Sequence, residues 1–414
     1  MSETNTKQIF DDTEFEQVCD FVTQLILQAH RYGVSFVRLQ TFTSQLPQLF
    51  GIHGHMLAAP PFLFFEFSRP TDTQPYRIIH PLPDGSFELT KLSFLGSLLN
   101  DLSSGKASLV EAPERLKQID SFPPPYKNPF VALGYCLCGA GFAVLLSAAW
   151  SDLIFAAVLS LVVFAITMYA RRSQWMAERI NFTSAVVSSI LASIIALLFP
   201  GSNAFTVALC AVIVLIPGLS LTVGVAELAS KSTITGINRL VDGILITFAL
   251  VVGSAVGSSI VNALWIVPAP FAPPGYSLIF AFISVVFIML GLALIFQVRP
   301  RDLVWVILGG IIAYTGIVIG GQFGNWQGSF LGALGLGIYS TLVVDRLSLP
   351  SSVIMLPGIM ILVPGVAAYF GLDTLQTSGI IGGLQAIWGV VVQIVAIIGG
   401  LFIAASVLSQ KASL

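Results

Sequence analysis

The chain has 414 residues, of which 55% are hydrophobic and only 10% are charged, and its formal net charge is −2. Mean hydropathy is +0.88. This composition excludes an ordinary soluble domain and a basic nucleic-acid-binding protein, and it indicates a membrane protein.

The charged residues divide the chain into a polar head, residues 1–128, and a membrane body. The head carries 10 Lys and Arg with 14 Asp and Glu, whereas the 286 residues from Pro129 onward carry 9 and 7. The opening stretch is acidic and lacks the apolar core of a signal peptide, so the head is expected in the cytosol. Four cysteines at Cys19, Cys136, Cys138 and Cys210 fit neither a disulfide framework nor a zinc site.

Periodicity in the head predicts a small α+β domain. Apolar residues recur at helical spacing over 13–30, 36–52 and 89–119, the last interrupted at 103–105, and strand-like runs occupy 60–70 and 74–83. The histidines of "GIHGHM" are interpreted as a polar loop. No nucleotide loop, catalytic spacing or metal cluster is visible, so neither an enzyme nor a cofactor is expected. A proline-rich link, 120–129, leads into the body.

The body contains ten apolar runs, each about as long as a bilayer requires. They cover 129–150, 153–170, 180–199, 204–224 and 241–267, followed by 276–298, 303–320, 329–344, 353–371 and 384–408. With the head inside, all nine basic residues of the body fall on the cytoplasmic side, as the positive-inside rule requires. The sequence therefore predicts ten transmembrane helices with both termini cytoplasmic, in a multi-pass protein of the cell membrane.

Two prolines interrupt corresponding spans. Pro217-Gly218 and Pro364-Gly365 lie 147 residues apart, and glycines follow each pair after the same intervals, Gly236 with Gly383 and Gly253 with Gly400. We interpret residues 129–267 and 276–408 as two five-helix repeats, which an odd number of spans would insert in opposite orientations. Inverted repeats with broken helices are typical of secondary transporters.

The breaks are the candidate substrate site. Proline removes a backbone donor and the adjoining glycine lets the helix unwind, so freed polar groups must be satisfied by protein, water or a polar ligand. At a single site a simple kink would explain the proline, whereas a symmetric pair favours a binding site. The candidate substrate-binding residues are Pro217, Gly218, Ser220, Thr222, Pro364, Gly365 and Asn181.

Three charged residues near the first break are candidates for proton coupling or an ion pair. Glu227 lies nine residues after Gly218, and Arg239 precedes Asp242 by three, which places these two on one face if both are helical. Ionisable groups at membrane depth are functional candidates. The alternative is that all three form a solvated anchor at the cytoplasmic interface.

The chain resembles the threonine/serine exporter (ThrE) family in its fused two-part form. The matching stretches are "GVSFVRLQ" with Arg38, "SLVEAPERLKQI", "IPGLSLTVGVAELASKSTITGINRL" and "PSSVIMLPGIMILVPG". One departure is Gln40, where the family often places an acid. The resemblance implies ten inner-membrane spans, a cytoplasmic amino-terminal domain, and efflux of small hydroxy amino acids driven by the proton motive force.

On this basis we expect half-helix amino-termini to bind a substrate carboxylate, while Glu227 or Asp242 accepts its ammonium group or a counter-transported proton. The expected partners are an amino acid, protons and membrane lipid; a homo-oligomer is compatible with the sequence. A dicarboxylate exporter with Arg239 as an anion clamp is the nearest alternative, and a passive channel is a more distant one.

Overall fold

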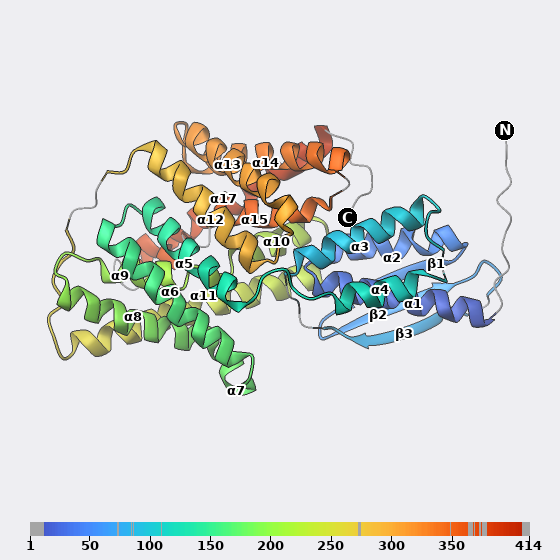
Figure 1. Ribbon diagram of the computed structural model, residues 1–414, viewed down its shortest axis with the longest axis horizontal. Coiled ribbons are helices and arrows are strands. Elements are labelled where there is room, and N and C mark those ends of the chain that lie inside the picture. The colour runs from blue at the N-terminus through green and yellow to red at the C-terminus, as the bar shows by residue number, and fades with distance from the viewer. Residues whose placement is uncertain are drawn as a thin grey trace.

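The computed structural model describes residues 12–407, apart from 73, 84, 86, 109, 272–274, 348, 363–366, 368, 372–373 and 375–378. The head and the helical body lie end to end along the long axis of the molecule (Figure 1). Their buried apolar side chains form a continuous core, so the head is packed onto the body.

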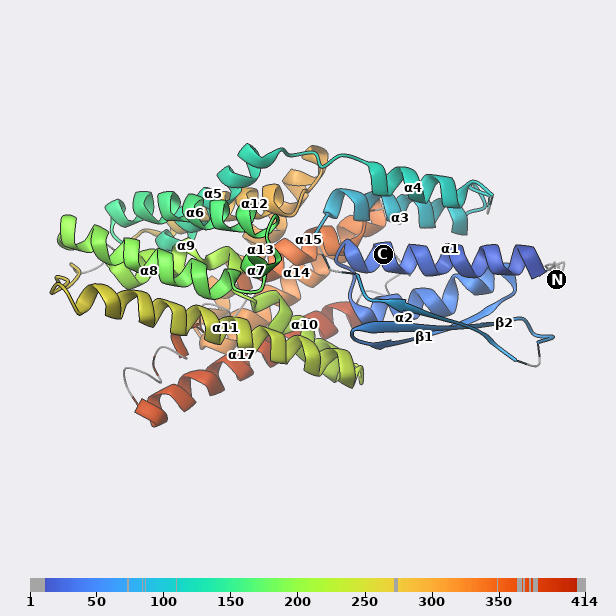
Figure 2. The same ribbon diagram turned by 90° about the horizontal axis from the view of Figure 1, so that it is seen from below.

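The head contains helices on one side of a small sheet. Its elements are α1 (Asp12–Arg31), α2 (Phe36–Gln45), the 3₁₀ helix η1 (Pro47–Phe50), β1 (His53–Ala59), β2 (Phe62–Ser68), β3 (Tyr76–Pro81), α3 (Leu89–Ser103) and α4 (Ala112–Ser121). The strands are antiparallel in the order β1-β2-β3. Figure 2 shows α1 and α2 between the sheet and the pair α3 and α4.

Strand β1 corrects the prediction of a polar loop at "GIHGHM". Its residues alternate between exposed His53 and His55 and buried Gly54 and Met56. This is the period of two of a half-buried strand, and pairing with β2 leaves both histidines on the outer face. Among the described residues, no group of three or more metal-ligating side chains comes together.

The body is built almost entirely of helices. They are α5 (Asn128–Leu145), α6 (Trp150–Ala170), α7 (Gln174–Ala177), α8 (Ile180–Leu198), α9 (Ala204–Ala211), η2 (Ile213–Leu215), α10 (Gly218–Ala229), α11 (Thr233–Asn262), α12 (Leu278–Ile295), η3 (Pro300–Asp302), α13 (Leu303–Gly321), α14 (Asn325–Leu347), α15 (Ser351–Leu362) and α17 (Gly379–Val407). In the described part of the chain eight helices are long and apolar enough to cross a membrane, and a bent pair formed by α9 and α10 makes a ninth candidate.

Several predicted span boundaries differ from the structure by a few residues, and two spans differ more. The fifth span begins at Thr233 rather than Val241, because Arg239 and Asp242 continue the helix without a breaker, and α11 reaches 30 residues. The ninth predicted span, 353–371, contains the shorter helix α15 and then enters residues outside the described part of the chain.

Helices α5 and α12 pack closely through facing glycines. A Cβ atom on Gly134 would lie 2.8 Å from the carbonyl oxygen of Gly291, and one on Gly291 would lie 2.7 Å from that of Gly134. Further along, a Cβ on Gly141 would lie 3.1 Å from the carbonyl oxygen of Ser284. Residue numbers rise on one helix as they fall on the other, so these two helices are antiparallel.

The same local structures occur in both halves of the body. The residues after α5 and α12, Ser147 and Gln297, both adopt φ of 56°. In each turn the next amide donates back to the helix, from Ala148 to the Ala143 oxygen and from Val298 to the Ala293 oxygen, at 2.9 Å in both cases. This pattern of a left-handed residue followed by a backward hydrogen bond is a helix C-cap.

The helices that follow also pack in corresponding ways. A Cβ on Gly253 of α11 would lie 2.7 Å from the carbonyl oxygen of Phe182 on α8, and one on Gly400 of α17 would lie 2.5 Å from that of Phe330 on α14. Side chains at both positions are excluded because the backbones touch.

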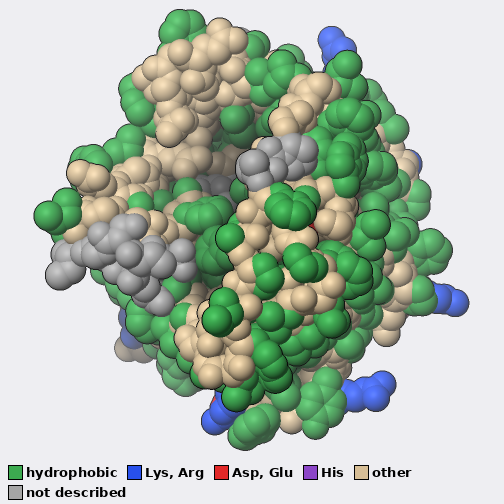
Figure 3. Space-filling view, turned by 90° about the vertical axis from the view of Figure 1, so that its left-hand side faces the viewer, with side chains coloured by type: hydrophobic (Ala, Val, Ile, Leu, Met, Phe, Trp, Pro, Cys, Tyr) green, Lys and Arg blue, Asp and Glu red, His purple; other side chains and the backbone are tan. Residues whose placement is uncertain are grey.

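The end of the body away from the head is apolar. Figure 3 shows hydrophobic side chains spread across this face among uncharged polar side chains and backbone, with the visible Lys and Arg side chains at its edge.

Candidate functional site

The candidate site begins at the interruption between α9 and α10. The two helices bend by 53° at this point. Ile216 is extended, as expected for a residue that precedes proline. Its amide donates to the Ile213 oxygen, and helical bonding resumes where the Leu221 amide donates to the Pro217 oxygen at 3.0 Å. The break predicted at Pro217-Gly218 is therefore present.

This geometry gives α10 a separate amino-terminus inside the body. Pro217 is its N-cap and Gly218 its first residue. The first amides of a helix have no partner within that helix and carry partial positive charge. The start of α10 can therefore receive an anionic group such as a carboxylate.

A cavity of about 770 Å³ lies against this helix start. Ligand cavities are commonly about 300–1,000 Å³, so its size suits a small molecule. The cavity combines apolar walls with a few charged and polar side chains, contributed by α3, α10 and the residues that flank α3, α5, α6 and α12. Its lining includes Pro217, Ser220, Ile246, Arg171, Glu88, Lys91, Tyr126, Gln297 and Met360.

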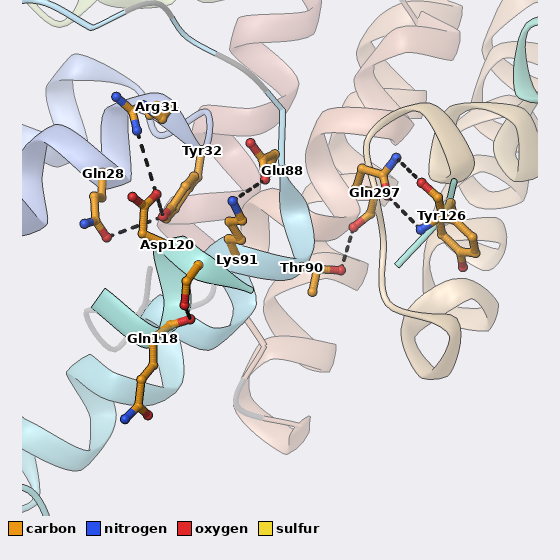
Figure 4. Close-up of polar contacts among 11 residues, drawn as sticks. Gln28, Arg31, Tyr32, Glu88, Thr90, Lys91, Gln118, Asp120, Tyr126 and Gln297 are labelled. Carbon is orange, nitrogen blue, oxygen red and sulfur yellow. Dashed lines mark hydrogen bonds and ion pairs between the residues drawn. The ribbon is translucent and has the colours of Figure 1, made fainter. Parts of the chain in front are cut away.

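The cavity also touches the junction between head and body, which is held by polar contacts (Figure 4). The side chain of Gln297 accepts from the Tyr126 amide at 3.0 Å and donates to the Tyr126 oxygen at 3.2 Å, while the Thr90 hydroxyl donates to the Gln297 backbone oxygen. Lys91 and Glu88 form an ion pair of 2.8 Å. Sequence reasoning missed this part of the cavity because only docking of the head brings it beside Pro217.

Glu227 lies at the other end of α10, about 14 Å along the helix from Gly218 at 1.5 Å per residue. Its side chain is 1% exposed and its Oε1 lies 3.2 Å from Nε of Arg239. The same oxygen accepts from the Phe36 amide of the head at 3.4 Å. The guanidinium of Arg239 also lies over the Phe36 ring, 5.3 Å from its centre. This cluster joins the head to α10 and α11.

The head side of the cluster contains a buried histidine. The His30 ring stacks on Phe36 with centroids 4.8 Å apart. Burial, with a smaller contribution from the positive charge of Arg239, lowers the pKa of His30 to about 4. His30 is therefore neutral at physiological pH.

The remaining predicted residues do not gather at one point. Thr222 is buried on α10, whereas Asn181 is partly buried at the start of α8 and Asp242 is exposed on α11. The ion pair of Arg239 is with Glu227 rather than with Asp242. Pro364 and Gly365 lie outside the described residues.

Near the second predicted break, the side chain of Gln393 makes two hydrogen bonds. Leu362 ends α15, and its carbonyl oxygen accepts from the side-chain amide of Gln393 on α17 at 3.4 Å. The same amide donates to Ser329 Oγ at 2.9 Å. Gln393 thus supports the end of the helix that precedes Pro364.

These observations define the chain as a multi-pass membrane protein with an interrupted helix beside a cavity. The family model described as "Putative threonine/serine exporter" matches residues 21–261, and the model "Threonine/Serine exporter, ThrE" matches residues 278–407. The chain belongs to the threonine/serine exporter family.

Two curated proteins are similar to it. One is the "Probable threonine/serine exporter" of Mycobacterium tuberculosis, 24% identical over 317 residues, which covers 72% of this chain and 58% of that protein. The other is the "Threonine/serine exporter" of Corynebacterium glutamicum, 24% identical over 331 residues, covering 74% and 65%. The chain thus spans about three fifths of the length of these relatives. No solved structure matches it.

Proposed function

We propose that this chain is a secondary active transporter that exports threonine and serine across the cell membrane, driven by the proton motive force. Family membership and the names of the two relatives support the substrate class. The observation that carries the proposal is the cavity of about 770 Å³ at the start of α10, because it offers an anion-binding helix end at an interrupted span.

In this proposal the substrate carboxylate binds at the amides that begin α10, and Ser220 contributes a hydroxyl. Glu88, Lys91 and Arg171 line the same cavity, so the entrance from the head side carries both signs of charge, as a zwitterionic substrate does. Glu227 is our candidate for the residue that carries the coupled proton. It is a buried acid on the same helix and forms an ion pair with Arg239.

We further propose that the body consists of two inverted five-helix repeats, with ten spans in all. Three observations support this arrangement. The equivalent helices α5 and α12 are antiparallel, the turns at Ser147 and Gln297 are alike, and Gly253 and Gly400 meet corresponding partners. Inversion would let each repeat present its break to the same central region.

The proposed orientation places the head and both termini in the cytoplasm. All nine Lys and Arg residues of the body fall on one side in the ten-span arrangement. In Figure 3, which views the end opposite the head, the Lys and Arg side chains lie only at the edge, which agrees with an outer surface poor in basic residues.

The test is efflux from proteoliposomes that contain the purified full chain and labelled threonine. Efflux should accelerate when the outside is made acidic relative to the lumen, and a protonophore should abolish the acceleration. Excess serine should compete, whereas succinate should not. No acceleration in sealed, protein-containing vesicles would refute proton-driven export, competition by succinate alone would favour a dicarboxylate exporter, and unsaturable flux would favour a channel.

A further inference from the structure

A second charged feature at the head–body junction lies apart from the cavity. Arg38 belongs to α2 of the head, and its Nη1 lies 3.4 Å from Ser352 Oγ in the first turn of α15. Arg38 is partly buried, and burial lowers the pKa of its guanidinium. Arginine is nevertheless charged at any physiological pH.

The surroundings of this cation are electrostatically unfavourable. The first turn of a 12-residue helix carries partial positive charge, so α15 presents its positive end to a guanidinium. No ion pair links Arg38 to an acidic side chain among the described residues. A hydrogen bond of 3.4 Å to a neutral hydroxyl is weak and compensates little of the charge of a partly buried guanidinium.

A second polar group at this helix start lacks a partner. Ser351, the first residue of α15, is 3% exposed, and its Oγ is buried without a hydrogen-bond partner in the described structure. Buried hydroxyls are normally hydrogen-bonded, and Ser351 adjoins Ser352, the residue that Arg38 contacts, so this helix start has room in its hydrogen bonding for a further acceptor.

In the first half of the body, the start of the corresponding helix, α9, binds a carboxylate group. Helix α9 begins at Ala204, 147 residues before Ser351, the same interval that separates the two proline–glycine pairs. Asp152 provides a carboxylate there, which accepts from the Ser202 hydroxyl at 2.5 Å and from the Asn203 amide at 3.1 Å. In the second half, Asp302 is instead bound to Arg299 at 3.0 Å.

We propose that Arg38 and the first turn of α15, with Ser351 and Ser352, form a binding site for a small carboxylate anion. The guanidinium would bind the carboxylate through two parallel N–H groups, and the serine hydroxyls would donate to its oxygens. The ligand is the carboxylate of a cytoplasmic amino acid or of another small organic acid. The site is separate from the cavity at α10, and it depends on the proposed export only in the choice of threonine as one probe.

The test is thermal unfolding of the purified full chain in detergent, at constant ionic strength with chloride as the reference. The probes are sodium acetate, L-threonine and L-threonine amide, which lacks the carboxylate. Acetate and threonine should raise the midpoint in a saturable way, and the amide should not. A shift with threonine alone that Arg38→Gln removes identifies the amino acid as the source of the carboxylate, whereas equal Arg38-dependent shifts with acetate and threonine identify a general small-acid site.

Three variants separate binding from structure. In Arg38→Gln the acetate-dependent shift should disappear, and the threonine-dependent shift should fall to what the cavity at α10 alone provides, while the midpoint in chloride stays the same or rises because an unpaired charge has been removed. Arg38→Lys should keep the shift with an apparent affinity about tenfold weaker, since lysine cannot form the bidentate contact. The control Arg77→Gln, which removes an exposed guanidinium on β3, should leave the anion response unchanged.

Two results would overturn the proposal. One is a wild-type protein whose midpoint does not respond to any carboxylate. The other is an Arg38→Gln variant with a lower midpoint in chloride and an unchanged anion response, because Arg38 would then be structural. Failure of threonine efflux in proteoliposomes would not produce either result, so the two proposals fail independently.

Discussion

The cluster of Glu227, Arg239 and Phe36 should hold the head against the body, and Glu227→Gln tests this by removing the negative charge at its centre. The substitution keeps an oxygen that can accept from the Phe36 amide but removes the negative charge. At the observed 3.2 Å the attraction is about 5 kcal/mol at an effective dielectric constant near 20. Much of it offsets the desolvation of an acid that is 1% exposed.

The net effect follows from what remains after the substitution. Breaking a buried pair costs about 3–5 kcal/mol because the other charge is left uncompensated. The side chain of Arg239 is 27% exposed, so water would partly hydrate it after the substitution. The loss of stabilising free energy at the head–body junction should therefore be about 2–3 kcal/mol.

Amide hydrogen exchange of peptides that cover residues 30–38 measures this loss directly, since they contain Phe36. A loss of about 2–3 kcal/mol would lower their protection roughly 30- to 150-fold. The matched control is Glu66→Gln, which removes the acid of a 3.0 Å pair with Arg77 that is 44% and 70% exposed. Exposed pairs contribute about 0–1 kcal/mol, so the control should change protection less than about fivefold. If Glu227→Gln behaves like the control, the charge of Glu227 does not help to hold the head in place.

Three further results are expected. Ser220→Phe should fill part of the cavity and reduce threonine efflux at least tenfold in proteoliposomes, whereas Ser406→Phe on the exposed end of α17 should not; equal rates would exclude the cavity as the pathway. Gly253→Ala and Gly400→Ala should lower the unfolding midpoint by similar amounts, because each Cβ meets a carbonyl oxygen within 2.7 Å. Gly389→Ala is the control: its Cβ would have no atom within 4 Å, so the substitution should be neutral or stabilising by up to about 1 kcal/mol. Unequal losses at Gly253 and Gly400 would contradict equivalent packing of the two halves. Because the pKa of His30 is about 4 in the folded protein and 6.5 unfolded, stability should be unaffected above pH 6.5 and fall by up to about 3 kcal/mol as the pH drops toward 4. His30→Phe should remove that part of the pH dependence in unfolding experiments, and an unchanged pH profile would show that His30 is not the titrating group.

The sequence by itself determined the class of protein and the position of the first break. Long apolar runs must be helical in lipid, because no water is present to satisfy backbone groups, and Pro217 must interrupt a helix wherever it stands in one. The head helices followed from their apolar periodicity. Strand β1 did not, because "GIHGHM" is too polar and too rich in glycine to indicate a strand, and pairing with β2 forms it.

Only the tertiary structure decided which charges meet. Local spacing placed Arg239 beside Asp242 on one helix, whereas packing of α10 against α11 and of the head against both brought it to Glu227. Packing likewise brought Lys91 of the head to the cavity beside Pro217, and it brought Arg38 to the start of α15. These partners are separated in sequence by 126 and 314 residues, intervals over which no local pattern carries information, because contacts of this kind are set by how whole surfaces pack.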